Sequence, residues 1–197
     1  MSKEIPQLYG LVLAGGKSTR MGSDKGLIQY HDRPQQEYLY HLLEQVCSKV
    51  YLSIRNEQQA SVSNEFNVIA DQNEYHGPFN GILSAHKAHP NVAWMVLACD
   101  LPLLDLESIK DLAAKRNPDM LATSYATHES GLPEPLVTIW EPAALKKSIA
   151  HLESTDSSCP RKFLINSDIQ LTQPKQDEVL YNANSLSDYE FAKSKLG

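Results

Sequence analysis

The stretch LYGLVLAGGKSTRMGSDK, residues 8–25, decides the fold of this chain. Its first six residues, Leu8–Leu13, are almost all apolar and carry no charge, as in a short buried strand. Gly15 and Gly16 end the apolar run, and the residues after them are polar. The pattern predicts a buried strand whose carboxyl end opens into a glycine-bearing loop.

The rest of the chain alternates between strand and helix patterns. We expect helices at 34–46, 81–88, 106–113, 143–152 and 185–195, and further strands at 50–54, 66–70, 92–98, 120–125, 136–140 and 178–181. Strands that alternate with helices imply βαβ units and a largely parallel sheet. We therefore predict one domain over residues 1–197, an α/β protein with three α/β/α layers. Residues 125–135 are interpreted as a long loop between two strands.

Composition narrows the class of protein. The chain has 197 residues, of which 42% are hydrophobic and 21% charged, as in ordinary soluble domains. Its longest apolar run, 94–99, is far shorter than the roughly 20 residues of a membrane span, and no signal-peptide pattern precedes the first strand. The net charge of −6 argues against a nucleic-acid partner. We expect a cytoplasmic protein with reduced cysteines that binds neither membranes nor nucleic acid.

The loop after the first strand combines glycines with cations. Gly15 and Gly16 let the backbone approach a phosphate, and Lys17, Arg20 and Lys25 add positive charge around a polyphosphate. The spacing fits neither a Walker loop nor a dinucleotide-binding fingerprint. The alternative is an ordinary strand-to-helix turn with solvated lysines. The combination favours a nucleoside triphosphate.

Other polar residues follow the strands whose carboxyl ends should share one edge of the sheet, where open α/β sheets bind ligands. Asp100 directly follows the most apolar strand, which suits a Mg²⁺ that bridges phosphates, or else a helix N-cap. Asp71 precedes a glycine-bearing loop and is a candidate contact for a base or sugar, or an Asx turn. Asn182 and Asn184 should end the last strand on one face, unless Asn184 only caps the final helix.

These motifs together resemble the nucleotidyltransferase superfamily, and within it the molybdenum cofactor guanylyltransferases, the molybdopterin-guanine dinucleotide biosynthesis protein A-like family. The resemblance is carried by LAGGKSTRMGSDK at 13–25, VIADQNEYHGPFNGI at 68–82, ACDLP at 98–102 and YNANSLSDYE at 181–190. It covers roughly residues 8–190 and implies a Rossmann-like, glycosyltransferase-A-like nucleotidyltransferase fold. The segments 127–135 and 157–162 depart from the better-known guanylyltransferase pattern.

The resemblance also implies roles for individual residues. It implies nucleotide contacts at Leu13, Ala14, Gly15, Gly16, Lys25, Ser53, Asp71 and Asp100. It implies that Arg20, Lys25 and Asp100 are catalytic, that Asp100 holds Mg²⁺, and that Asn182 faces the acceptor. Ser53 stands where the family often has an asparagine.

The implied reaction is transfer of GMP from GTP to the phosphate of molybdopterin or the molybdenum cofactor, with release of pyrophosphate and with molybdenum-insertion proteins as partners. A phosphate nucleophile is already deprotonated at neutral pH, so no general base is needed. Transfer of CMP, or transfer to a sugar or polyol phosphate, remains an alternative. A catalytically silent GTP-binding assembly protein is the non-enzyme alternative.

Overall fold

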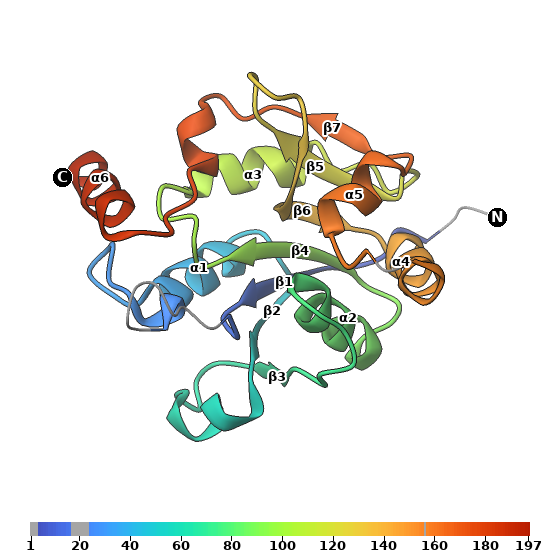
Figure 1. The fold of residues 1–197 in the computed structure, drawn as a ribbon, viewed down its shortest axis with the longest axis horizontal. Coiled ribbons are helices and arrows are strands. Elements are labelled where there is room, and N and C mark those ends of the chain that lie inside the picture. Colours follow the sequence, from blue (N-terminus) through green and yellow to red (C-terminus); the bar gives the residue numbers. More distant parts are fainter. Residues whose placement is uncertain (1–3, 17–23, 156) are drawn as a thin grey trace.

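The computed structural model describes residues 4–16, 24–155 and 157–197. Within these ranges seven strands form one sheet in the order β3-β2-β1-β4-β6-β5-β7 (Figure 1). The strands are β1 (Leu8–Leu13), β2 (Lys49–Ile54), β3 (Val68–Ala70), β4 (Ala93–Ala98), β5 (Ala122–Ala126), β6 (Pro133–Trp140) and β7 (Gln170–Thr172). The helices are α1 (Gln35–Glu44), α2 (Pro78–Ala88), α3 (Leu106–Ala114), α4 (Pro142–Ser154), α5 (Pro160–Ile165) and α6 (Leu186–Leu196).

The first half of the sheet is parallel. β1 pairs in parallel with β2 and β4, and β2 pairs in parallel with β3. Leu13 lies in register with Ser53 on one side and with Ala98 on the other. The carboxyl ends of these strands therefore open at one edge, which brings the loop after β1 beside the segments that begin at Asp71 and Asp100.

The second half of the sheet is mixed. β6 runs antiparallel to β4 and β5, while β7 pairs in parallel with β5. β6 begins at Pro133, so the connection between β5 and β6 is shorter than the predicted loop over 125–135. The pairing of β5 with β6 shifts register between Ser124 and Ala126, opposite the end of β6 that carries two prolines. Because proline donates no ladder hydrogen bond, this end of β6 gives a weak strand pattern in sequence.

Helices cover both faces of the sheet. On one face, Leu39 and Leu43 of α1 and Ile109 of α3 pack with strand residues such as Val12. On the other face, helices α2, α4 and α5 pack against strand residues such as Leu11. Successive side chains of a strand point to opposite faces, so neighbouring residues of β1 feed two separate cores. The predicted three-layer α/β/α fold with a mostly parallel sheet is confirmed.

The elements predicted after residue 66 differ in detail from those of the structure. The predicted strand at 178–181 is a 3-10 helix, η3 (Asp177–Leu180), in which Val179 and Leu180 reach the core from a single turn. The short elements α5 and β7 carry too few residues to show a period and were not predicted. α2 begins at Pro78 because Gly77 adopts a φ of 62°, a conformation that glycine accepts, and proline suits the first helical position.

Candidate active site

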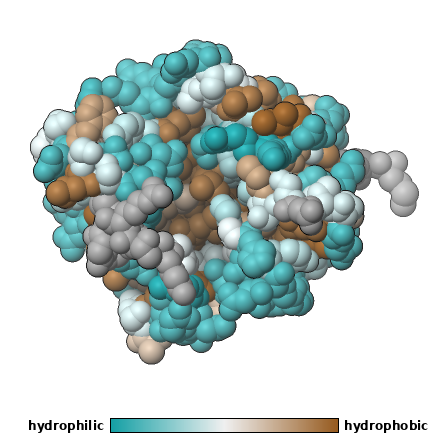
Figure 2. Space-filling view, viewed as in Figure 1, coloured by the Kyte–Doolittle hydropathy of each residue, from teal (hydrophilic) through white to brown (hydrophobic). Residues whose placement is uncertain are grey.

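A cavity of about 430 Å³ lies at the edge where the parallel strands end. It is lined by residues of the loop after β1, the ends of β2 and β4, and the loop between β3 and α2, including Leu13, Ala14, Gly15, Gly16, Lys25, Ser53, Arg55, Asp71, Tyr75, Gly81, Asp100 and Leu136. The space-filling view shows this face hollowed near its middle, with apolar residues on the floor (Figure 2). The structure thus brings together every predicted nucleotide-binding residue.

Asp71 and Ser53 form a buried pair at one part of this cavity. The Ser53 hydroxyl donates a hydrogen bond of 2.6 Å to Asp71 Oδ1, and the two residues are 1% and 8% exposed. Burial raises the pKa of the Asp71 carboxyl, while the Ser53 hydrogen bond and the nearby Arg55 oppose that rise. The backbone N–H of Asp71 donates to the carbonyl of Ile54, which continues the pairing of β3 with β2. This carboxylate is therefore held rigidly at the cavity wall.

Asp100 and Lys25 meet at another part of the cavity. Lys25 Nζ lies 3.5 Å from Asp100 Oδ2 and donates a 2.5 Å hydrogen bond to Asn184 Oδ1. Asp100 Oδ1 is buried and has no hydrogen-bond partner among the described residues. Burial raises the pKa of Asp100, and the positive charge of Lys25 lowers it in part. The backbone N–H of Ala183 donates to the Asp100 carbonyl, so the segment after η3 is tied to the end of β4.

A brace from β2 holds the first loop. Arg55, just after β2, donates to the Gly15 carbonyl and to Asp24 Oδ2 at 2.5 and 3.2 Å. Gln58, in the 3-10 helix η2 (Asn56–Ser61), donates to the same Asp24 oxygen at 2.7 Å and to the Ala14 carbonyl at 3.3 Å. These two side chains fix the loop residues on both sides of 17–23. The sequence analysis missed them, although both follow the carboxyl end of a parallel strand.

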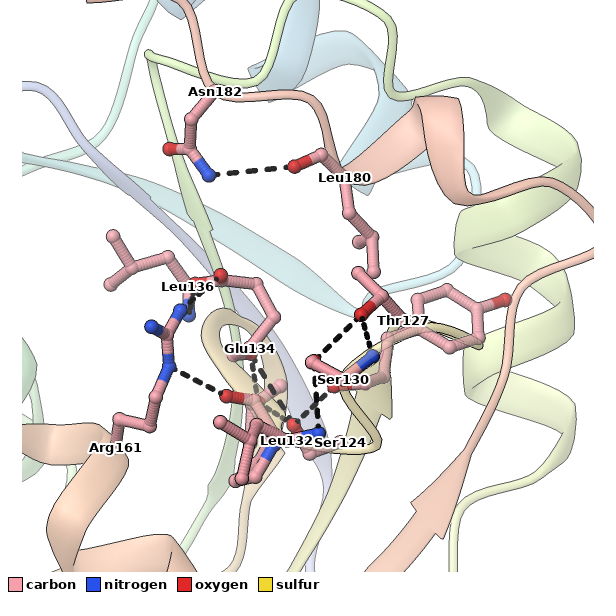
Figure 3. A network of polar contacts seen from close by, with 12 residues as sticks. Ser124, Thr127, Ser130, Leu132, Glu134, Leu136, Arg161, Leu180 and Asn182 are labelled. Carbon is pink, nitrogen blue, oxygen red and sulfur yellow. Dashed lines mark hydrogen bonds and ion pairs between the residues drawn. The ribbon is translucent and has the colours of Figure 1, made fainter.

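A second polar network lies beside the cavity, on the side of β6 (Figure 3). Arg161 of α5 donates to Glu134 Oε2 at 2.8 Å and to the Pro133 carbonyl at 3.0 Å. Glu134 is only 8% exposed, and burial raises its pKa while the Leu136 N–H and Arg161 lower it. Figure 3 shows Asn182 across from this pair, with its amide donating to the Leu180 carbonyl. The sequence pattern places Glu134 in the predicted loop over 125–135 and does not show that it belongs to a buried strand.

The two asparagines near the C-terminus do not lie as predicted. No strand includes them, so the expectation that they share one face of a strand is wrong. Asn184 does not cap the last helix, because Ser185 accepts from Asp188 N in that role, and Asn184 instead accepts from Lys25. Asn182 is not among the described residues that line the cavity, and its acceptor role stays a prediction. Arg20 lies outside the described residues.

The described residues show no ready-made cluster of metal ligands. Among them no group of three or more His, Cys, Asp or Glu side chains converges. Asp100 still fits Mg²⁺, because no described residue contacts its buried Oδ1 by a hydrogen bond and Mg²⁺ takes one or two carboxylates together with phosphate oxygens and water. The ligands that complete such a site would come from the nucleotide. No described helix combines the length and apolar content that crossing a membrane requires.

Two curated relatives of this chain have names that refer to the molybdenum cofactor. The "Molybdenum cofactor biosynthesis bifunctional protein" of Synechocystis sp. is 39% identical over 92% of this chain, and the chain spans 52% of that protein's length. The "Molybdenum cofactor guanylyltransferase" of Pseudomonas fluorescens is 28% identical, with 92% of this chain and 91% of that protein covered.

Solved structures share the fold. The Archaeoglobus fulgidus "Molybdopterin-guanine dinucleotide biosynthesis protein A" superposes with a TM-score of 0.76 at 20% identity, covering 95% of this chain and 98% of that one. A CMP:2-keto-3-deoxy-manno-octonic acid synthetase complexed with CTP gives 0.74 at 11% identity, with 96% and 98% covered. The family profile described as "MobA-like NTP transferase domain" matches residues 10–171. This chain therefore belongs to the MobA-like NTP transferase family and is a nucleotidyltransferase.

Proposed function

We propose that the chain transfers GMP from GTP to the phosphate of molybdopterin or the molybdenum cofactor in the cytoplasm and releases pyrophosphate. The names of its relatives support this acceptor and this nucleotide. The chain spans about half the length of the Synechocystis relative, so it corresponds to one part of that bifunctional protein. Molybdenum-insertion proteins are the expected partners that deliver or receive the cofactor.

The observation that carries the proposal is one cavity with two different carboxylate sites. Asp71 follows β3 and Asp100 follows β4, and these strands are three positions apart in the sheet. Three strand spacings amount to roughly 14 Å. A nucleoside triphosphate that lies along this edge can place its base near Asp71 and its phosphates between the loop after β1 and Asp100.

The Asp71 end favours guanine. A fixed carboxylate accepts hydrogen bonds and donates none when it is ionised. Guanine presents two adjacent donors, N1–H and the 2-amino group, whereas cytosine, adenine and uracil each present a single donor group along the matching edge. Two donors from one base edge suit the Asp71 carboxylate, and residues Leu13–Gly16 line the same cavity, where their backbone would add contacts.

The Asp100 end suits phosphoryl chemistry. An oxygen of the acceptor phosphate attacks the α-phosphorus of GTP, a new P–O bond forms, and the bond to the pyrophosphate oxygen breaks. Lys25 is placed to neutralise charge that develops on the phosphates, and Asn184 holds its ammonium group in position. Asp100 would hold Mg²⁺, which when bound supplies further neutralisation of phosphate oxygens. Asn182 and the adjoining β6 side would receive the acceptor, and Arg20 would add a contact to the polyphosphate.

The proposal is tested by pyrophosphate release. Purified protein is given Mg²⁺, molybdopterin and one of GTP, CTP, ATP or UTP, and separately GTP with common sugar phosphates. We expect release only with GTP and molybdopterin. Release with CTP in place of GTP would identify a cytidylyltransferase, and tight GTP binding without release would identify a silent binding protein; both outcomes reject the proposal.

A further inference from the structure

We propose that Ser53 is a positioning residue for base selection: its hydroxyl fixes the Asp71 carboxylate so that the remaining oxygen reads the 2-amino group of guanine. The inference rests on the proposed use of GTP. In this inference Ser53 does not contact the nucleotide itself but orients Asp71, which does.

The contacts of Ser53 support an indirect role. Its hydroxyl is directed at Asp71 Oδ1, at 2.6 Å, and only 1% of Ser53 is exposed. Among the hydrogen bonds of the described residues, none reaches the other oxygen, Oδ2. The Ser53 hydroxyl therefore occupies Oδ1, and Oδ2 can accept hydrogen bonds from a ligand at the cavity wall.

Two glycines make room for this pair. A Cβ placed on Gly15 would lie 2.8 Å from Asp71 Oδ2, and a Cβ on Gly81 would lie 2.3 Å from Ser53 Oγ. Both distances are shorter than real Cβ contacts, so neither position accepts a side chain without displacing the pair. The absence of side chains at Gly15 and Gly81 thus leaves the space that the Ser53–Asp71 pair occupies.

The chemistry of the pair points to a ligand rather than to packing. A buried carboxylate that lacks donors is costly, and native proteins satisfy such groups. Arg55 is the charged group that acts on Asp71 in the described structure, yet its hydrogen bonds go to Gly15, Asp24 and Glu57. None of the described residues donates a hydrogen bond to Oδ2, so a ligand in the cavity can supply donors to this oxygen. Guanine supplies two, whereas hypoxanthine, which lacks the 2-amino group, supplies one.

The orientation of the carboxylate decides whether both donors are reached. Without the Ser53 hydroxyl, Asp71 retains its place on the backbone but loses the contact that fixes the rotation of its carboxylate. The second donor of guanine is then reached less well. The catalytic end, at Lys25 and Asp100, is unchanged. Loss of the hydroxyl should therefore raise the KM for GTP and leave kcat nearly unchanged.

The experiment compares GTP with ITP, which differs only by the 2-amino group. Kd is measured by titration calorimetry and kcat/KM by pyrophosphate release for the unchanged protein, Ser53→Ala, Asp71→Asn and the double variant. Ser148→Ala is the matched control, because Ser148 is a fully buried serine whose hydroxyl bonds Leu145 within α4, away from the cavity. Thermal unfolding of each variant checks that it folds.

We expect the unchanged protein and Ser148→Ala to prefer GTP over ITP by about tenfold or more. Ser53→Ala should reduce that preference to about threefold or less, with kcat for GTP retained. If Ser53 acts through Asp71, adding Ser53→Ala to Asp71→Asn should not reduce the preference further.

Three results would overturn the inference: a full preference for GTP in Ser53→Ala, a further loss in the double variant, or equal binding of GTP and ITP by the unchanged protein. The calorimetric preference does not depend on the acceptor. A failure of the transfer reaction with molybdopterin therefore counts against the proposed function alone and remains distinguishable from a failure of the inference.

Discussion

Two carboxylates, Asp71 and Asp100, occupy equivalent places in the sheet and differ in their surroundings. Asp71 comes directly after β3 and Asp100 two residues after the end of β4, each is largely buried, and burial raises the pKa of each. Asp71 receives a hydroxyl hydrogen bond on Oδ1. Asp100 has a buried Oδ1 that no residue of the described ranges hydrogen-bonds, and a lysine ammonium 3.5 Å from Oδ2.

The difference indicates which ligand each carboxylate accepts. A neutral hydroxyl fixes Asp71 without cancelling its charge, which leaves an acceptor for N–H groups of a base. Lys25 partly compensates Asp100 but leaves one oxygen open, which suits a hard cation that arrives with phosphate. One edge of a sheet thus offers hydrogen-bond recognition at one strand end and charge neutralisation at another.

The largest effect is expected at Asp100. Asp100→Asn keeps the shape of the side chain but removes its charge, so turnover should fall by about 10²–10³-fold, the range seen when a group that stabilises transition-state charge is lost. GTP binding without metal should change little. Initial rates over a Mg²⁺ titration measure this effect. Turnover near that of the unchanged protein would remove Asp100 from the proposed mechanism.

Lys25→Ala should cost less. Loss of one charge-assisted contact to phosphate is expected to lower kcat/KM by about 10–100-fold. Lys195→Ala is the charge-matched control, because Lys195 of α6 forms an exposed ion pair with Glu178 of η3. Steady-state kinetics with GTP check the prediction. An equal loss in both variants would mean that the effect reflects net charge rather than the place of Lys25 beside Asp100.

The substitution Asp100→Asn should lower activity but raise the stability of the folded protein. The folded pKa of Asp100 is raised above its ordinary value, so the folded state binds this proton more readily than the unfolded state. The contribution of Asp100 to the free energy of unfolding therefore declines as pH rises from about 4 through the raised folded pKa, and stays lower above it.

Asp100→Asn removes this unfavourable ionisation, so its Tm at pH 7.5 should exceed that of the unchanged protein, by about 2–4 °C for each kcal/mol regained. The difference in Tm should shrink as pH falls toward 4. Thermal unfolding over pH 4–8, in metal-free buffer, measures both trends. A lower Tm for Asp100→Asn throughout that range would show that Lys25 fully compensates the carboxylate.

The smallest effect is expected at the brace. Arg55→Ala removes the hydrogen bonds to Gly15 and Asp24 while Gln58 still holds Asp24. We expect a rise in the KM for GTP of about three- to tenfold, as for loss of a partly buried hydrogen bond, and a nearly constant kcat. Arg55→Lys should recover part of the loss. A fall in kcat with an unchanged KM would place Arg55 in the transfer step instead.

The sequence allowed prediction of the parts of the site that depend on local pattern. Leu13–Gly16, Asp71 and Asp100 lie at or within three residues of the ends of apolar strands, and the alternation of strands with helices predicts that those ends share one edge. Their placement in one cavity agrees with that prediction. The family resemblance, rather than the local pattern, supplied the preference for GTP and for the pterin acceptor.

Other parts depend on contacts between distant segments and left no local signal. Arg55 meets Asp24, 31 positions earlier, and Lys25 meets Asn184, 159 positions later. The strand predicted at 178–181 rests on two apolar residues, and a 3-10 turn buries the same two residues. Contacts such as those of Arg55 with Asp24 and of Lys25 with Asn184 can be identified only once the order of the strands in the sheet is known.

The central claim is that base recognition and transfer occupy separate ends of one cavity. Asp71→Asn and Asp100→Asn, measured side by side, test it most directly through Kd for GTP and CTP and through kcat at saturating GTP with molybdopterin and Mg²⁺. The account predicts that Asp71→Asn loses most of the preference for GTP but keeps kcat, while Asp100→Asn keeps the preference and loses kcat. Loss of both properties in both variants would contradict the separation.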